Sequence, residues 1–134
     1  MSVSKEILEK VNKWTNFAEE DLRLAKHSLT LASNCPFRLT AYHAQQCAEK
    51  YLKAFLVYNQ IDFPYTHSLT RLLELTSKSL KRDKLEEVGT LSVYAITTRY
   101  PGEDEEVSKE DAEEAIRLAE IVKKRIQEEF AKLM

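Results

Sequence analysis

Apolar residues recur at steps of three and four over three long segments of this chain, which is the spacing of one face of an α-helix. The segments cover residues 4–33, 37–59 and 108–132. In the first, the apolar positions are Ile7, Val11, Trp14, Ala18, Leu22, Ala25 and Leu29. Only two Gly and three Pro occur among 134 residues, which favours long helices over a turn-rich β-fold. The sequence therefore predicts a protein built mainly from long helices.

Two shorter segments between these are also expected to be helical. The first begins at Thr66 or His67, ends near Lys81 and carries Leu69, Leu72, Leu73 and Leu80. The second covers residues 83–99, where apolar spacing stays helical although Gly89 and the β-branched run at 96–98 weaken it. Helices joined by short connections pack into bundles. The predicted fold class is all-α, an antiparallel four- or five-helix bundle forming a single domain over residues 1–134.

Charge and cysteine content narrow the classes of function. The net charge is −2, from 20 basic and 22 acidic side chains, so any contact with nucleic acid has to be local. Cys35 and Cys47 are too few for a disulfide framework and lie in no zinc-binding pattern, so both are expected to be reduced packing residues. An acidic run at 103–106 precedes a helix, where the helix dipole explains it. We expect no bound metal and no cofactor.

The start of the chain lacks the continuous apolar core of a signal peptide, and no apolar run approaches the length of a membrane span. A cytoplasmic protein that does not contact the membrane is therefore expected. Trp14 and Phe17 lie near the apolar face of the first predicted helix, and we expect both to be core residues rather than a platform for stacking bases.

A polar stripe runs along the second predicted helix, opposite its apolar side. Its members are Gln46, Glu49, Lys50 and Lys53, which fall within about 100° of one another around the helix axis. Periodicity alone favours a solvated face, on which Glu49 and Lys53 form an i,i+4 ion pair. Nothing catalytic follows from this spacing by itself.

The same helix carries the strongest sequence motif. Residues 42–54, YHAQQCAEKYLKA, resemble the signature second helix of the HEPN family, a Gln-Gln-x-Ala-Glu-Lys-x-x-Lys-Ala pattern. Three further pieces resemble family segments in the expected order: FAEEDL at 17–22, THSL at 66–69 and RYP at 99–101. The resemblance implies a helical bundle that forms a homodimer and is often encoded beside a minimal nucleotidyltransferase in a toxin–antitoxin pair.

The resemblance also implies a site for RNA or a nucleotide beside the second helix. Its expected members are Gln46, Glu49, Lys50, Lys53, His67, Arg99 and Tyr100. Lysine and arginine would contact phosphate, and Tyr100 would stack on a base. Two alternatives stay open here: His67 could be part of a helix cap with its ring bonded locally, and Arg99 could pair with Glu103 or Asp104.

Some relatives are metal-independent endoribonuclease toxins with an Arg followed four to six residues later by His, near the start of a late helix. Here Arg99 is followed by acidic residues at 104–106, so that late histidine is absent. Arg38 and His43 have the spacing, and they are the candidate catalytic pair, but they project about 140° apart at the start of the second helix. An oligomeric protein-interaction module is a third interpretation.

Overall fold

The computed structural model describes residues 3–77, 79–80, 85–95 and 106–133, and within these ranges it contains helices and no strand. The helices are α1 (Lys5–Ser28), α2 (Phe37–Tyr58), α3 (Leu69–Thr76) and α4 (Lys109–Leu133), with a 3₁₀ helix, η1 (Glu86–Tyr94), between α3 and α4. The predicted all-α bundle is confirmed. Each of the three long periodic segments of the sequence forms one of the three long helices.

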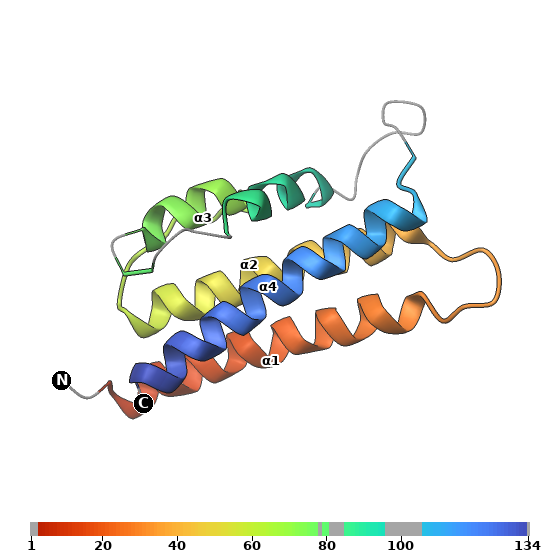
Figure 1. Cartoon of the computed structure of the whole chain (residues 1–134). Helices are drawn as coiled ribbons and strands as arrows, with labels where there is room; N and C mark the ends of the chain where they lie inside the picture. Colours follow the sequence, from red (N-terminus) through yellow and green to blue (C-terminus); the bar gives the residue numbers. More distant parts are fainter. Residues whose placement is uncertain (1–2, 78, 81–84, 96–105, 134) are drawn as a thin grey trace.

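The three long helices lie side by side, and α3 and η1 lie along one side of α2 and α4 (Figure 1). The chain reverses between α1 and α2, so these two helices are antiparallel (Figure 1). In contrast, α4 runs in the same direction as α2, because α3 and η1 carry the chain back along the bundle (Figure 1). The Tyr58 hydroxyl therefore donates to the carbonyl oxygen of Leu133, which joins the ends of α2 and α4.

Three ends of predicted α-helices differ by more than one residue from the observed ones, one in α1 and two in α3. The first helix ends at Ser28 instead of 33, because the hydroxyls of Ser28 and Thr30 bond to carbonyls of the last turn and compete with its continuation. The third begins at Leu69, where the Ser68 hydroxyl caps it by accepting from the Arg71 N–H. It ends at Thr76.

The predicted α-helix at 83–99 is instead the 3₁₀ helix η1 over residues 86–94, and positions 83–84 and 96–99 lie outside the described residues. Gly89 explains part of this difference. It weakens an α-helix, and it lets η1 approach α3 so closely that an added Cβ would lie 2.8 Å from the Thr70 Oγ1 atom.

The core is built around α2, whose apolar side is buried against α1, α3 and α4. The apolar residues at helical spacing on this side are fully buried and comprise Ala41, Ala44, Ala48, Tyr51, Leu52 and Phe55. The prediction for Phe17 was wrong, because its side chain is 51% exposed, while Trp14 is half-buried. No helix among the described residues combines the length and apolar character that crossing a membrane requires.

Candidate functional site

The polar stripe of α2 is not a solvated face. Gln46, Glu49 and Lys53 are 7%, 2% and 5% exposed, and only Lys50 is half-buried. The interpretation from periodicity was wrong because the segment between α2 and α3, residues 59–68, folds back over the stripe from one side and α1 covers it from the other. Charged side chains are rarely buried unless they are paired, so Glu49 and Lys53 are expected to have partners inside the protein.

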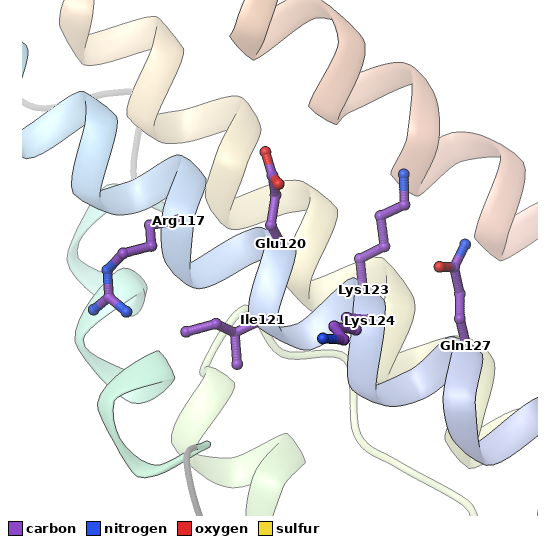
Figure 2. Close-up of a pocket in the computed structure, with 6 residues that line it drawn as sticks. All are labelled: Arg117, Glu120, Ile121, Lys123, Lys124 and Gln127. Atoms are coloured by element: carbon purple, nitrogen blue, oxygen red, sulfur yellow. The ribbon is translucent and has the colours of Figure 1, made fainter.

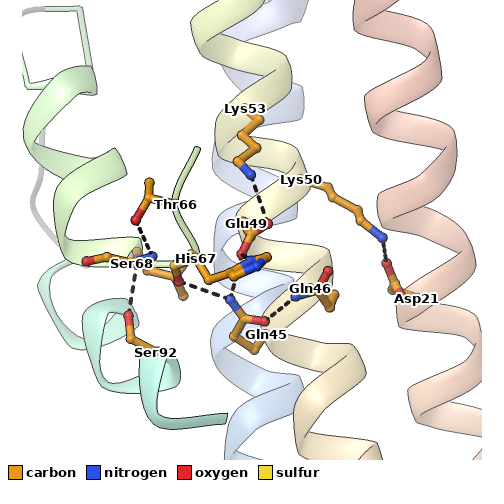
Figure 3. A network of polar contacts seen from close by, with 11 residues as sticks. Asp21, Gln45, Gln46, Glu49, Lys50, Lys53, Thr66, His67, Ser68 and Ser92 are labelled. Carbon is orange, nitrogen blue, oxygen red and sulfur yellow. Dashed lines mark hydrogen bonds and ion pairs between the residues drawn. The ribbon is translucent and has the colours of Figure 1, made fainter. Parts of the chain in front are cut away.

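Glu49 lies at the centre of one group of contacts (Figure 3). Its Oε2 atom accepts from the Lys53 Nζ at 3.0 Å, and its Oε1 atom lies 2.9 Å from Nδ1 of His67. Gln45 donates from Nε2 to Glu49 Oε1 at 3.0 Å and to the His67 carbonyl oxygen at 3.4 Å. We call Gln45, Glu49, Lys53 and His67 the Glu49 cluster. Gln46 supports it by donating to Gln45 Oε1 at 2.7 Å.

His67 belongs to this cluster and does not act as a local cap. Ser68 caps α3, and the His67 ring reaches across to α2, so the alternative with a locally bonded ring was wrong. The turn that presents the ring is fixed by two further bonds, from the Ser68 N–H to the Thr66 hydroxyl and from the Leu69 N–H to the Ser92 hydroxyl (Figure 3). The His67 side chain remains 48% exposed.

Three aromatic rings enclose the Lys53 ammonium. Its Nζ lies 5.4 Å from the ring centroid of Trp14, 5.8 Å from that of Phe63 and 6.0 Å from that of Tyr65. A desolvated ammonium is stabilised by the faces of such rings. Lys53 is therefore satisfied inside the protein, and it supports the site from within rather than at the surface.

A second group of contacts joins α2 to α1. Asp21 accepts from Lys50 through Oδ2 at 2.5 Å, and its Oδ1 lies 2.8 Å from Nδ1 of His43. We call Asp21, His43 and Lys50 the Asp21 cluster. The carboxylate is 12% exposed, whereas the imidazole and the ammonium-bearing side chain are 26% and 22% exposed. The ring of Phe17 lies 5.9 Å from Lys50 Nζ.

Sequence reasoning missed Asp21 and Gln45. Asp21 gave a signal, because it is a carboxylate among the inward positions of α1, next to Leu22 and between Ala18 and Ala25. Such a position predicts a paired acid. For Gln45, the sequence contains no signal of a buried polar contact beyond its place in the motif.

The structure does not bring the candidate catalytic pair together. Arg38 is exposed in the first turn of α2, whereas the His43 ring faces α1 and contacts Asp21. The other two predicted site residues, Arg99 and Tyr100, lie outside the described residues. Gln46, Glu49, Lys50, Lys53 and His67 lie in or beside the two clusters on one side of α2.

A third polar contact ties the three long helices together on the α4 side. Glu19 of α1 accepts from the Tyr51 hydroxyl at 2.6 Å and from the Lys123 ammonium at 2.8 Å. Burial by itself would raise the pKa of the Glu19 carboxyl, but the hydrogen bonds from Lys123 and Tyr51 outweigh it, and the pKa is lowered from 4.5. Burial raises the pKa of Tyr51, and the bond to Glu19 adds to this effect. Glu19 is thus held ionised as a structural link.

Stability should consequently depend on the charge of Glu19. A carboxyl whose pKa is lower in the folded state contributes stability above its ordinary value of 4.5 and loses this contribution as the pH falls further. Glu19→Gln is expected to lower the free energy of unfolding by about 1 kcal/mol at pH 7, with the difference shrinking between pH 5 and about pH 3. Urea titrations over this range measure it. Glu20→Gln, a change at the neighbouring exposed carboxyl of α1, is the control and should follow wild type.

Cys47 is fully buried, and burial raises the pKa of its thiol, so it is an unreactive packing residue. Cys35 is half-buried, and its thiol donates to the carbonyl oxygen of Ser28. Within the described ranges, no three His, Cys, Asp or Glu side chains gather in a way that could hold a metal ion.

A shallow depression of about 290 Å³ lies along α4 (Figure 2), and none of its lining residues belongs to either cluster. Its lining consists of Arg117, Glu120, Ile121, Lys123, Lys124 and Gln127. Arg117 pairs with Glu87 and Glu114, and Lys123 pairs with Glu19, so much of its positive charge is already neutralised.

Comparisons with known proteins agree with the motif. A family model described as HEPN domain matches residues 11–129, which include both clusters. A Methanocaldococcus jannaschii protein named "Putative toxin MJ1304" is 34% identical, and the match covers 78% of each chain. The crystal structure of TT1696 from Thermus thermophilus is similar with a TM-score of 0.71 and 27% identity, covering 90% of this chain and 98% of that one. The chain belongs to the HEPN domain family.

Proposed function

We propose that this protein is the RNA- or nucleotide-binding component of a toxin–antitoxin-type pair. It consists of a single HEPN domain, forms a homodimer and works together with a minimal nucleotidyltransferase. The observation that carries the proposal is the pair of buried carboxylates on one side of α2, each holding one histidine and one lysine. The relative named as a toxin supports the toxin–antitoxin role. RNA is preferred to a protein ligand because imidazole and ammonium groups recognise phosphate.

The parts of this site differ in their expected roles. Glu49, Lys53 and Gln46 are at least nine-tenths buried, so they position the groups around them. Lys50 and His67 are exposed enough to meet a ligand, and Tyr65, whose side chain is 93% exposed, lies beside the His67 ring with their centroids 5.7 Å apart. An exposed aromatic ring next to an imidazole suits single-stranded RNA, whose unpaired bases stack on aromatic side chains. Arg99 and Tyr100 remain proposed members of the site.

Lys50→Ala tests this assignment. It is expected to weaken binding of a single-stranded RNA oligonucleotide about five- to tenfold and to lower the slope of log K against log salt by about 0.7, because one phosphate contact is lost. Fluorescence anisotropy titrations between about 50 and 200 mM salt measure both quantities.

Lys124→Ala is the matched control, since it removes an exposed lysine from α4 on another part of the surface. It should leave affinity and slope close to wild type. Equal binding by wild type and Lys50→Ala would show that RNA does not use this face, and the protein-interaction interpretation would then gain support.

The proposed partner is tested by growth of the host cells. Expression of the protein alone should slow growth, and co-expression of a nucleotidyltransferase encoded beside it should restore growth.

The proposed homodimer is tested by light scattering. At micromolar concentration it should give twice the 15.5 kDa mass of the chain. A species of 15.5 kDa alone would contradict the homodimer.

A further inference from the structure

We call residues 62–66, which lie between α2 and α3, the strap. None of its backbone N–H or carbonyl groups is hydrogen-bonded to another described residue. On one side of the strap, the Ile61 N–H donates to the Leu56 carbonyl oxygen at 2.9 Å. On the other side, the His67 carbonyl oxygen accepts from Gln45 Nε2 at 3.4 Å. The strap is therefore fixed at its two ends, and its backbone can move without breaking a helix.

The chain leaves α2 through a fixed turn. Gln60 has a φ of 55°, which lies in the left-handed region. The Gln60 N–H donates to the Val57 carbonyl oxygen at 3.0 Å, and the Ile61 N–H donates to that of Leu56. These two bonds form the Schellman motif that ends many helices. Movement of the strap therefore begins after Ile61, and α2 keeps its own hydrogen bonds.

Side chains hold the strap against α1 and α2. The Phe63 ring meets Trp14 of α1 edge to face, with centroids 6.5 Å apart. Phe63 and Tyr65 also provide two of the three rings around Lys53 Nζ, at 5.8 and 6.0 Å from their centroids. Contacts made by so few side chains open far more readily than a whole helical bundle unfolds.

A buried ion pair lies under the strap. The side chains of Glu49 and Lys53 are 3% and 6% exposed, and their charged atoms are 3.0 Å apart. Removing two charges from water costs about as much free energy as their attraction returns, so burial of the pair opposes opening only weakly. Opening the strap would lose the contacts of Phe63 and Tyr65 but would hydrate both charges. The open and closed forms therefore differ in free energy by far less than the folded and unfolded chains.

We propose that the strap opens and closes over the Glu49–Lys53 pair while the helices stay folded, and that single-stranded RNA binds the closed form. The preference of RNA for the closed form rests on the RNA-binding function proposed above. Tyr65 on the strap and His67 directly after it are 93% and 48% exposed, with ring centroids 5.7 Å apart. The closed strap holds these two rings in place on α2. A ligand that contacts them there shifts the equilibrium toward the closed form.

The first experiment measures opening by labelling lysine amines of the full chain with acetic anhydride at low extent, followed by mass spectrometry. Lys53 reacts only when the strap exposes it. Phe63→Ala removes ring contacts of the strap and should raise the labelling rate of Lys53 about tenfold. It should also increase the quenching by acrylamide of Trp14, the single tryptophan of the chain. Phe17→Ala, which deletes the exposed ring beside Lys50, is the matched control and should change neither quantity.

Urea separates movement of the strap from unfolding of the chain. Urea favours each state in proportion to the surface that the state exposes, and opening of the strap exposes little. The labelling rate of wild-type Lys53 should therefore rise much less steeply with urea than the unfolded fraction measured by circular dichroism. An equally steep rise would mean that Lys53 reacts only in the unfolded chain, and it would overturn the proposal. Wild-type labelling and quenching in folded Phe63→Ala would also overturn it.

The last experiment adds a single-stranded RNA oligonucleotide at about 100 times its Kd. Labelling of Lys53 should become at least about tenfold slower, because RNA keeps the strap closed. The exposed Lys124 of α4 is the control and should be labelled at an unchanged rate. RNA that binds in anisotropy titrations but leaves Lys53 labelling unchanged, or makes it faster, would overturn the preference for the closed form. RNA that does not bind would contradict the RNA-binding function and this preference together, while movement of the strap would still be decided by labelling of the free protein.

Discussion

Replacing Phe55 with alanine is expected to lower the free energy of unfolding by about 3–5 kcal/mol, the range for removing a buried aromatic ring. Phe55 is 1% exposed and belongs to the cluster of buried residues around α2. Its ring stacks on Phe130 of α4 with centroids 6.3 Å apart. The substitution would remove apolar contacts and leave a cavity between α2 and α4. Urea titration followed by circular dichroism measures the change.

Phe17→Ala is the matched control, because it deletes the same ring from a position that is 51% exposed. We expect it to change the free energy of unfolding by less than about 1 kcal/mol. Equal losses for the two variants would contradict the arrangement of helices described above. Phe17→Ala therefore tests whether this side of α1 faces away from the core, and Phe55→Ala tests the packing of α2 on α4.

Phe55 is buried and Phe17 is exposed, and this difference shows what hydrophobic periodicity predicts well. Positions spaced at three and four along α2 and α4 are buried as expected, because each of these helices has neighbours along its apolar side. Phe17 follows the same spacing approximately, beside Ala18, yet no described element covers it. A sequence pattern gives the direction of a side chain around its helix, but the packing of other elements decides whether that direction is buried.

Helix ends were less predictable than helices. The end of α1 at Ser28 depends on hydroxyl groups that bond to nearby carbonyls, and such local bonds leave no periodic signal. The change from an α-helix to the 3₁₀ helix η1 depends on the close approach of Gly89 to Thr70. Both features are set by contacts between particular atoms rather than by the apolar pattern.

The candidate site was predictable in part. The motif identified Glu49, Lys50, Lys53 and His67, and the i,i+4 pairing of Glu49 with Lys53 is present. Their burial was not predictable from spacing, because it depends on residues 59–68 and Trp14 folding over them. Asp21 meets His43 and Lys50 only because α1 and α2 are antiparallel neighbours. Partners separated by more than 20 positions require the tertiary structure.

Glu49→Ala is expected to lower the free energy of unfolding by about 3–5 kcal/mol, because it leaves the buried ammonium of Lys53 without its carboxylate. The Lys53 side chain is 6% exposed, and the surrounding rings cannot replace a negative charge. Urea titration at pH 7 measures the loss. Glu74→Ala breaks an exposed ion pair with Arg71 and is the control, with an expected change below about 0.5 kcal/mol.

The double variant Glu49→Gln with Lys53→Met removes both charges while nearly keeping their volumes. It is expected to regain most of the stability lost in Glu49→Ala, since a buried ion pair contributes little beyond a well-packed neutral pair. Weak RNA binding by this stable variant would mean that the charges serve the ligand, through the position of His67. If the double variant bound RNA as tightly as wild type, the Glu49 cluster would serve only to hold residues 59–68 on α2. RNA would then be recognised by Lys50 and its neighbours around Asp21.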